Sequence, residues 1–333
     1  MAEAPRLETT PPRRPLLHPW LNLALRVGVT VALLAYAVRG VEWFDREVDG
    51  RVEKGMASVL TQADWSWWAA GLLLAVLVQV VAGIRWAELA RPLGFEFPRL
   101  LFVRRFFEGM FFSLCLPSSI GGDVVKAYRI GDSTPRRLLA GCTVLADRLT
   151  GLSALAVLGG AALAARKYDL SLMATLLVAG GLLAVALAAF LLALAFLDRI
   201  VGLLPEGPAR RFLAQLLPYQ QRPSLIAKAV GWSFLVQAGG AVSVAVSARA
   251  LGVEQPLSVW FSVVPLVALA MVLPISIGGF GVRENATAFL LSEQGVPADR
   301  AVGVALLWGL SQIAIGLVGG VLFMLDRSAE KSS

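Results

Sequence analysis

A turn-forming motif is written twice in this chain, each time at the end of an apolar stretch. Residues 116–126 have the sequence LPSSIGGDVVK, and residues 273–283 have the sequence LPISIGGFGVR. Proline removes a backbone donor and clashes with the preceding helical turn, while paired glycines release the chain from helical angles. Each copy should therefore break a helix, and the sequence predicts two broken helices.

The duplication extends on both sides of the motif. The pattern R-x-L-G-x-E-x-P begins at Arg91 and again at Arg249, which is 158 positions later (249 − 91 = 158). The triplet Gly-Leu-Ser begins at Gly151 and at Gly309, with the same separation (309 − 151 = 158). Duplicated halves, each with a Pro/Gly break in an apolar stretch, are typical of membrane transporters built from internal repeats.

The apolar content of the chain indicates its environment. Of its 333 residues, 57% are hydrophobic and only 16% are charged, and several apolar stretches can cross the roughly 30 Å hydrocarbon core of a bilayer. The formal charge of +7 does not indicate a nucleic-acid partner, because the cations lie in loops beside apolar stretches. We predict an all-α, polytopic membrane protein of about six full spans plus two re-entrant helical hairpins.

The expected spans follow from the apolar stretches. The flanking segments are residues 1–20, a basic cytoplasmic tail, and residues 326–333, a second cytoplasmic tail; residues 21–325 form a single transmembrane domain. Within that domain, repeat 1 covers about 66–166 and repeat 2 about 229–325. Full spans are predicted at about 21–38, 66–90, 148–166, 171–197, 229–250 and 301–325, with the hairpins formed around the two motifs.

Orientation is predicted from the positions of the cations. Lys and Arg are enriched in cytoplasmic loops, so the basic N-terminal tail and the basic loop at 199–228 are placed inside. The span at 66–90 then runs inward and the span at 229–250 runs outward, which makes the two repeats inverted. The first hairpin enters from the cytoplasm, and the second, whose flanks carry fewer cations, enters from outside.

The two helix breaks are the first candidate binding site. Unpaired peptide groups cost several kcal/mol each in hydrocarbon, so a break at membrane depth must be buried in protein or line a polar cavity. The glycine pairs precede short helices, whose N-terminal N–H groups and dipoles favour an anion. The alternative is that the motifs only kink packed helices. The candidate substrate-binding residues are Pro117, Ser118, Ser119, Gly121 and Gly122 in the first motif, and Pro274, Ser276, Gly278 and Gly279 in the second.

Ionisable residues beside the apolar core are the second set of candidates. Charges at bilayer depth cost about 2.5–3.5 kcal/mol each on insertion scales, so they face a cavity or one another. Contact with an anionic headgroup is favoured for Lys126, Arg129 and Arg283, with local ion pairing as the alternative. Arg85 is either part of the site or an ordinary interface anchor. The other candidates in this set are Asp123, Asp147, Arg148 and Glu284.

Catalytic chemistry is not indicated by the sequence. The one histidine, His18, lies before the first span and cannot serve as an intramembrane base or metal ligand. The two cysteines, Cys115 and Cys142, give neither a disulfide framework nor metal-ligand spacing. Acid–base work by Asp123 and Asp147 is the enzymatic alternative that the residues leave open. We expect a non-enzymatic protein with no metal and no cofactor.

Several stretches of the sequence resemble one family of integral membrane proteins. They are Arg85-Trp86, Phe111-Phe112, the stretch LPSSIGGDVVKAYR from 116 to 129, Asp147-Arg148, and the stretch LPISIGGFGVRE from 273 to 284. On these residues, the chain from about residue 20 to 325 resembles the lysylphosphatidylglycerol synthase transmembrane, or flippase-like, family. The resemblance implies translocation of a lipid across a bacterial cytoplasmic membrane. The full-length synthase adds a soluble aminoacyl-transferase domain, which this sequence does not contain, so aminoacylation is not implied.

The resemblance leaves the identity of the lipid open. Stand-alone members of that family are associated with hopanoid, glycolipid and polyprenyl-linked pathways. The expected function is a lipid flippase that holds the headgroup of an anionic or phosphate-linked (glyco)lipid between the two hairpins. Its expected partners are membrane lipids, either anionic phospholipid or polyprenyl-phosphate-linked lipid. The alternative is a membrane accessory subunit that presents a lipid to a partner glycosyltransferase or synthase.

Overall fold

A computed structural model of the protein describes most of the chain. The described residues are 19–39, 41–48, 51–53, 55–116, 121–168, 171, 174, 177, 178, 181, 182, 185, 192, 195–272 and 275–332. Four predicted site residues fall outside these ranges, namely Pro117, Ser118, Ser119 and Pro274. Most of the predicted span at 171–197 also falls outside them.

The described chain is all-α apart from one short hairpin, β1 (Arg46–Val48) paired antiparallel with β2 (Arg51–Glu53). This hairpin lies in the segment between the first two predicted spans, 21–38 and 66–90. The helices are α1 (Pro19–Arg39), α2 (Met56–Thr61), α3 (Trp65–Ala90), η1 (Arg91–Leu93), α4 (Arg99–Cys115), α5 (Gly121–Ile130), α6 (Thr134–Tyr168), α8 (Leu197–Leu203), α9 (Pro208–Ala214), α10 (Leu217–Gln220), α11 (Pro223–Ala248), η2 (Arg249–Leu251), α12 (Leu257–Val272), α13 (Val282–Ser292) and α14 (Ala298–Ser332).

Four of the described helical segments are long and apolar enough to cross a membrane: Trp65–Leu93, Thr134–Ala165, Pro223–Leu251 and Ala298–Asp326. They correspond to α3, α6, α11 and α14, and they confirm the membrane class. The segment of α6 begins well before the predicted span at 148–166. Charged residues in its first half did not prevent helix formation, because Asp147 and Arg148 find partners of opposite charge on α3 and α5.

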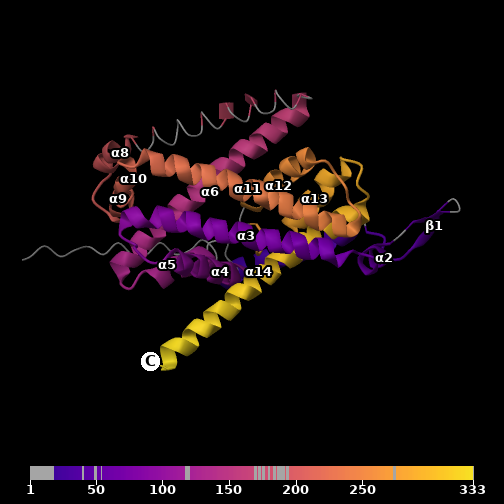
Figure 1. Ribbon diagram of the computed structural model, residues 1–333, viewed down its shortest axis with the longest axis horizontal. Helices are drawn as coiled ribbons and strands as arrows, with labels where there is room; N and C mark the ends of the chain where they lie inside the picture. Colours follow the sequence, from indigo (N-terminus) through magenta and orange to yellow (C-terminus); the bar gives the residue numbers. More distant parts are fainter. Residues whose placement is uncertain are drawn as a thin grey trace, which may run out of the picture.

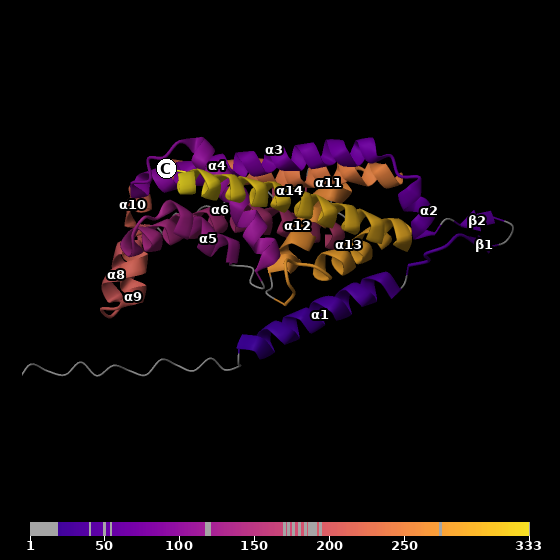
Figure 2. The same cartoon turned by 90° about the horizontal axis from the view of Figure 1, so that it is seen from below.

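Helices α3 and α11 lie side by side along the long axis of the molecule, and α6 and α14 cross them obliquely (Figure 1). At one end lie α5, α8, α9 and α10, and at the other lie α2 and the β1–β2 hairpin; α1 runs along one side of the bundle (Figure 2). The α4–α5 pair lies toward the first end and α13 toward the second (Figure 2). Both hairpins therefore reach the middle of the bundle, from different ends.

Helices α3 and α11 are equivalent in the duplicated sequence, and they pack antiparallel. Gly71 at the start of α3 lies against Ser247 near the end of α11, and Arg85 near the end of α3 binds Ser233 near the start of α11. Each helix ends in a 3₁₀ turn followed by a left-handed glycine, Gly94 (φ 81°) or Gly252 (φ 65°). The duplicated L-G pair thus has a structural reason, since glycine adopts this conformation at little cost.

Each hairpin packs against the last long helix of the other half of the chain. On the first hairpin, the backbone of α4 at Phe107 meets Gly319 of α14, where the missing side chain permits close contact. On the second hairpin, Leu269 of α12 packs over Gly159 of α6. A Cβ added to Gly159 would lie only 2.6 Å from the Leu269 side chain. The two halves are interleaved rather than folded side by side.

Candidate functional site

A polar cavity of about 440 Å³ lies where the two hairpins meet in the middle of the bundle. Its walls come from α3, α4, α5, α6, α11, α12 and α14, together with the turn before α13. The structure brings eight of the predicted site residues into this wall: Arg85, Asp123, Lys126, Asp147, Arg148, Ser276, Gly278 and Gly279. The duplicated motifs therefore do contribute to one common cavity.

Arg85 is held in the wall by two other helices. Its Nε donates to Asp147 Oδ1 of α6 at 2.8 Å, and its NH1 donates to Ser233 Oγ of α11 at 2.7 Å. Arg85 is 5% exposed and Asp147 4% exposed. The guanidinium is thus fixed within the protein, and the predicted alternative of a free interface anchor does not describe its position.

A second ion cluster on the cavity wall joins α5 to α6. Lys126 Nζ lies 2.7 Å from Asp123 Oδ1, one helical turn earlier, and Arg148 Nε donates to the other Asp123 oxygen at 2.6 Å. The Lys126 ammonium also lies 4.6 Å from the ring centroid of Phe106 and 5.7 Å from that of Trp86. These contacts fix the ammonium at the cavity without covering it completely.

The charges that line the cavity leave a positive excess. Three cations (Arg85, Lys126 and Arg148) face two carboxylates (Asp123 and Asp147), so the formal sum is +1. The other polar lining groups carry no charge: Gln79, Ser113, Gln237, Ser276 and Gln312. An anionic or zwitterionic group is therefore favoured over a cation in this space.

The turn of the second hairpin presents one unpartnered hydroxyl. Ser276 is 7% exposed, lines the cavity, and its Oγ is buried without a hydrogen-bond partner among the described residues. Gly278 (φ 59°) and Gly279 (φ 76°) follow in the left-handed region, which favours glycine. A buried, unsatisfied hydroxyl costs about 1–3 kcal/mol, so a ligand that hydrogen-bonds Ser276 would recover this energy.

An apolar groove of about 820 Å³ adjoins the polar cavity. It lies between α5, α6 and α12, with Phe212 of α9 at its edge. Five residues line both spaces: Asp123, Arg148, Leu152, Met271 and Val272. The remaining wall of the groove is largely apolar and includes Val124, Ala127, Leu138, Val144 and Leu145. A polar compartment thus lies directly beside an apolar one, and the two share part of their walls.

Five other predicted site residues do not line the cavity. Gly122 instead packs against α4, where an added Cβ would collide with the Gly109 carbonyl and Ser113 Oγ, and Gly121 packs against Leu116. These glycines permit close contact between α4 and α5, so any side chain there would wedge the hairpin open. The other three residues, Arg129, Arg283 and Glu284, belong to the ion pairs described next.

Arg283 and Glu284 form a closed pair on α13. Each is 1% exposed, and Arg283 NH2 lies 2.5 Å from Glu284 Oε1. The other Glu284 oxygen accepts from the Gly281 backbone N–H at 2.5 Å, which caps α13. In this conformation the structure places Lys126 at the cavity but not its sequence counterpart Arg283.

Arg129 belongs to a cluster that joins α4, α5 and α14. Its Nε lies 3.2 Å from Glu108 Oε2, and a second nitrogen binds Asp326. Asp326 also binds Arg104 at 2.9 Å and Arg105 at 2.6 Å. The sequence spacing of Arg104 and Glu108 predicts a local pair, which the structure confirms at 3.4 Å. Asp326 was missed, because only tertiary packing brings it to these arginines.

Three glutamines of the cavity wall were also missed by the sequence argument. Gln79, Gln237 and Gln312 lie on α3, α11 and α14, and all three line the cavity. Each is a polar residue within a predicted span. That was a usable signal, since polar side chains inside membrane helices normally face the protein interior or a cavity.

Metal binding has no support in the described ranges, where no group of three or more His, Cys, Asp or Glu side chains is close enough to hold an ion. Both cysteines are free thiols in the structure, Cys115 exposed and Cys142 buried. The site therefore consists of paired charges, uncharged polar groups and an adjoining apolar surface.

Comparison with known families shows to which family the chain belongs. The family described as lysylphosphatidylglycerol synthase TM region matches the chain over residues 23–320, so the protein belongs to this family. The match confirms the resemblance drawn from the two motifs and covers the membrane domain from α1 to α14. No curated protein gave a match to the chain.

Proposed function

Starting from that membership, we propose that the protein moves an anionic or phosphate-linked lipid across the membrane. The headgroup occupies the central polar cavity, and the tails follow the apolar groove between α5, α6 and α12 into the bilayer. The observation that carries this proposal is that the positively biased cavity adjoins the groove, with Asp123, Arg148, Leu152, Met271 and Val272 lining both spaces. A lipid has the same arrangement, a charged head joined to an apolar body.

The chemistry of the cavity suits a phosphate with further polar substituents. Lys126 and Arg148 supply charge, although each shares Asp123. Ser276 offers an unpartnered hydroxyl, and the three glutamines can donate to or accept from sugar, glycerol or amide groups. A carrier needs a site that releases as well as binds, and cations already paired with carboxylates bind an incoming phosphate less tightly than free ones.

We further propose that the halves are inverted repeats that alternate in exposing the cavity. Two observations support an inverted relation: the antiparallel packing of the equivalent helices α3 and α11, and the approach of the hairpins from different ends (Figure 2). Transporters of this construction keep the site near the membrane midplane while flanking elements move. The proposed location is the bacterial cytoplasmic membrane, with both termini inside.

No chemical step is assigned to the site in this proposal. The two carboxylates of the wall, Asp123 and Asp147, are each bound by arginine or lysine, which suits them to structural pairing. The protein is therefore proposed to act on lipid position only, alone or beside a lipid-modifying enzyme.

Reconstitution into liposomes tests the proposal. Vesicles of phosphatidylcholine containing fluorescent phosphatidylglycerol are treated with a membrane-impermeant quencher, which measures the fraction of probe in each leaflet. The wild-type protein should speed exchange between leaflets, and Ser276→Ala should slow it, while Lys228→Gln, at an exposed lysine of α11, should not. Phosphatidylglycerol that binds without crossing would favour the accessory-subunit alternative, and a chemically altered probe would indicate an enzyme.

A further inference from the structure

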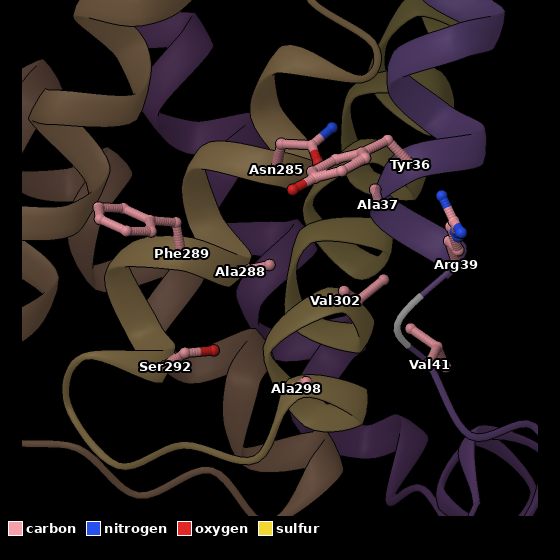
Figure 3. A pocket seen from close by; sticks show the side chains of 10 residues that line it. All are labelled: Tyr36, Ala37, Arg39, Val41, Asn285, Ala288, Phe289, Ser292, Ala298 and Val302. Carbon is pink, nitrogen blue, oxygen red and sulfur yellow. The ribbon is translucent and has the colours of Figure 1, made fainter.

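A second pocket, of about 600 Å³, lies between the end of α1, α13 and the start of α14 (Figure 3). It belongs to the end of the bundle that carries α2 and the β1–β2 hairpin, away from α5 (Figure 2). None of its lining residues lines the central cavity or the apolar groove. They are Tyr36, Ala37, Arg39, Val41, Asn285, Ala288, Phe289, Ser292, Ala298 and Val302.

This pocket is built on the sequence counterpart of the groove-lining helix. Helix α13 corresponds to α5, with Asn285 at the position of Tyr128 (285 − 128 = 157). Tyr128 lines the apolar groove in the first half, and Asn285 lines the second pocket in the other half. The same face of two equivalent helices therefore borders an open space in each half of the chain.

Helix α1 covers part of this face in the second half only. Asn285 Nδ2 donates to the Leu33 carbonyl at 2.7 Å, and the Ile277 backbone N–H donates to Thr30 Oγ1 at 3.0 Å. Leu33 packs directly against Gly281. A Cβ added to Gly281 would lie only 2.5 Å from the Leu33 Cβ, so this close contact requires glycine. On α5 the equivalent of Gly281 is Val124, which is 61% exposed. The second pocket is the part of the face that α1 leaves open.

The chemistry of the pocket suits a phosphate. Arg39 is the one charged residue of its described lining, and no ion pair or hydrogen bond joins it to another described residue. Around it the walls offer the Tyr36 hydroxyl, the Asn285 amide and the Ser292 hydroxyl, with Phe289 among the apolar lining residues; Figure 3 shows the Tyr36 ring beside Asn285 and Arg39 in the last turn of α1. Unlike the paired cations of the central cavity, Arg39 has no bound carboxylate among the described residues that would compete with an incoming anion.

We propose that this pocket is a second lipid site, which takes the phosphodiester headgroup of a lipid in the leaflet at the α2 end of the bundle. Arg39 binds the phosphate, and the apolar wall of α13 and α14 borders the upper part of the tails. The inference rests on the proposed lipid function, because it gives the carried lipid a separate binding place at the far end of its path.

Photo-crosslinking can test the two sites separately. Purified protein is reconstituted in phosphatidylcholine vesicles with phosphatidylglycerol that carries a diazirine near its glycerol, and crosslinked peptides are mapped by mass spectrometry. Wild-type protein should crosslink at residues 36–41 and 285–292. Arg39→Gln should lower these crosslinks at least fivefold and leave those on α5 and α6 unchanged. Arg46→Gln is the matched control, since Arg46 has the same charge but lies outside the pocket on β1 with a 70% exposed side chain.

Each outcome decides between the two proposals. Crosslinks at the second pocket that Arg39→Gln leaves intact, or crosslinks confined to α5 and α6, would overturn the second site and leave the central one standing. Crosslinks at the second pocket with none on α5 and α6 would overturn the central site instead. Crosslinks at neither place would overturn both. Arg39 is exposed, so its substitution should not prevent folding, and circular dichroism of the variant checks this.

Discussion

Replacing Lys126 by glutamine should weaken the binding of an anionic lipid, and the ion pair of this lysine determines by how much. The Lys126 ammonium lies at the central cavity, 2.7 Å from Asp123 Oδ1. Asp123 remains bound to Arg148 at 2.6 Å when the lysine is removed. The substitution therefore changes the charge of the cavity without leaving a buried carboxylate unpaired, so its effect on folding should be small.

The magnitude follows from the competing charges. A phosphate about 4 Å from the ammonium gains about 4 kcal/mol at an effective dielectric constant of about 20. Asp123, on the far side of the ammonium, repels the same phosphate across about 6.7 Å with about 2.5 kcal/mol. Lys126→Gln removes the attraction and keeps the repulsion. Water in the cavity weakens both, so we expect a loss of about 1–3 kcal/mol, the range of a charge-assisted hydrogen bond.

A double variant separates this account from a general loss of charge. Asp123→Asn with Lys126→Gln removes attraction and repulsion together, so the loss should fall to about 1.5 kcal/mol or less, which is about tenfold in Kd. The Asp123→Asn change in this double variant also removes the carboxylate that binds Arg148. Lys228→Gln, an exposed lysine on α11, is the control for net charge.

Binding is measured by native mass spectrometry of protein in detergent, titrated with phosphatidylglycerol and, separately, with phosphatidylcholine. The single variant should bind phosphatidylglycerol roughly five- to 150-fold more weakly than the parent, with the control unchanged. Equal affinity of Lys126→Gln and the control would refute a phosphate contact at this lysine. A double variant that binds no better than the single one would refute the role of Asp123 as the opposing charge.

Four further substitutions test the packing around the site. Asp147→Asn should leave Arg85 buried without its carboxylate and lower the free energy of unfolding by about 3 kcal/mol, measured by denaturant titration in detergent; unchanged unfolding would contradict the pair. Gly122→Ala should lower Tm because its methyl group meets a carbonyl of α4, whereas Gly141→Ala, with open space around its Cβ, should raise the free energy of unfolding by about 0.5–1 kcal/mol. Asp326→Asn should loosen the end of α14, seen as faster amide hydrogen exchange in its last turns; unchanged exchange would show that the arginine cluster does not hold it.

The duplicated sequence predicted the architecture best where glycine or proline had a backbone role. The L-G pairs at 93–94 and 251–252 end equivalent helices in left-handed glycines, and such a conformation leaves a clear mark in sequence. No left-handed glycine of this kind predicted that α6 begins at Thr134, ahead of the predicted span at 148–166. Two charged residues in the middle of α6, Asp147 and Arg148, are paired with Arg85 of α3 and Asp123 of α5, and those partners are distant in sequence.

Eight residues of the candidate site were predicted from the sequence, but the long-range pairing among them was not. Local spacing gives the pair of Lys126 with Asp123, three residues apart. It cannot give the pair of Arg85 with Asp147, which are 62 residues apart and meet only through helix packing. For Arg283 the local alternative holds: headgroup contact was favoured from the sequence, whereas the structure pairs this arginine with the adjacent Glu284 and buries it outside the cavity wall.

The packing of each hairpin on the other half's last helix has a consequence for how such a protein could arise. A chain with only one repeat would have no partner for the backbone of its hairpin, because α4 meets Gly319 of α14 and α12 meets Gly159 of α6. Under the inverted arrangement proposed above, it would gain these contacts only from a second copy inserted in the opposite orientation. An ancestral single-repeat gene would therefore have had to make a protein of dual topology, and fusion of two copies would have fixed the two orientations in one chain. Fragments of this chain cut between the repeats should accordingly be recovered together when co-expressed, and neither should accumulate alone.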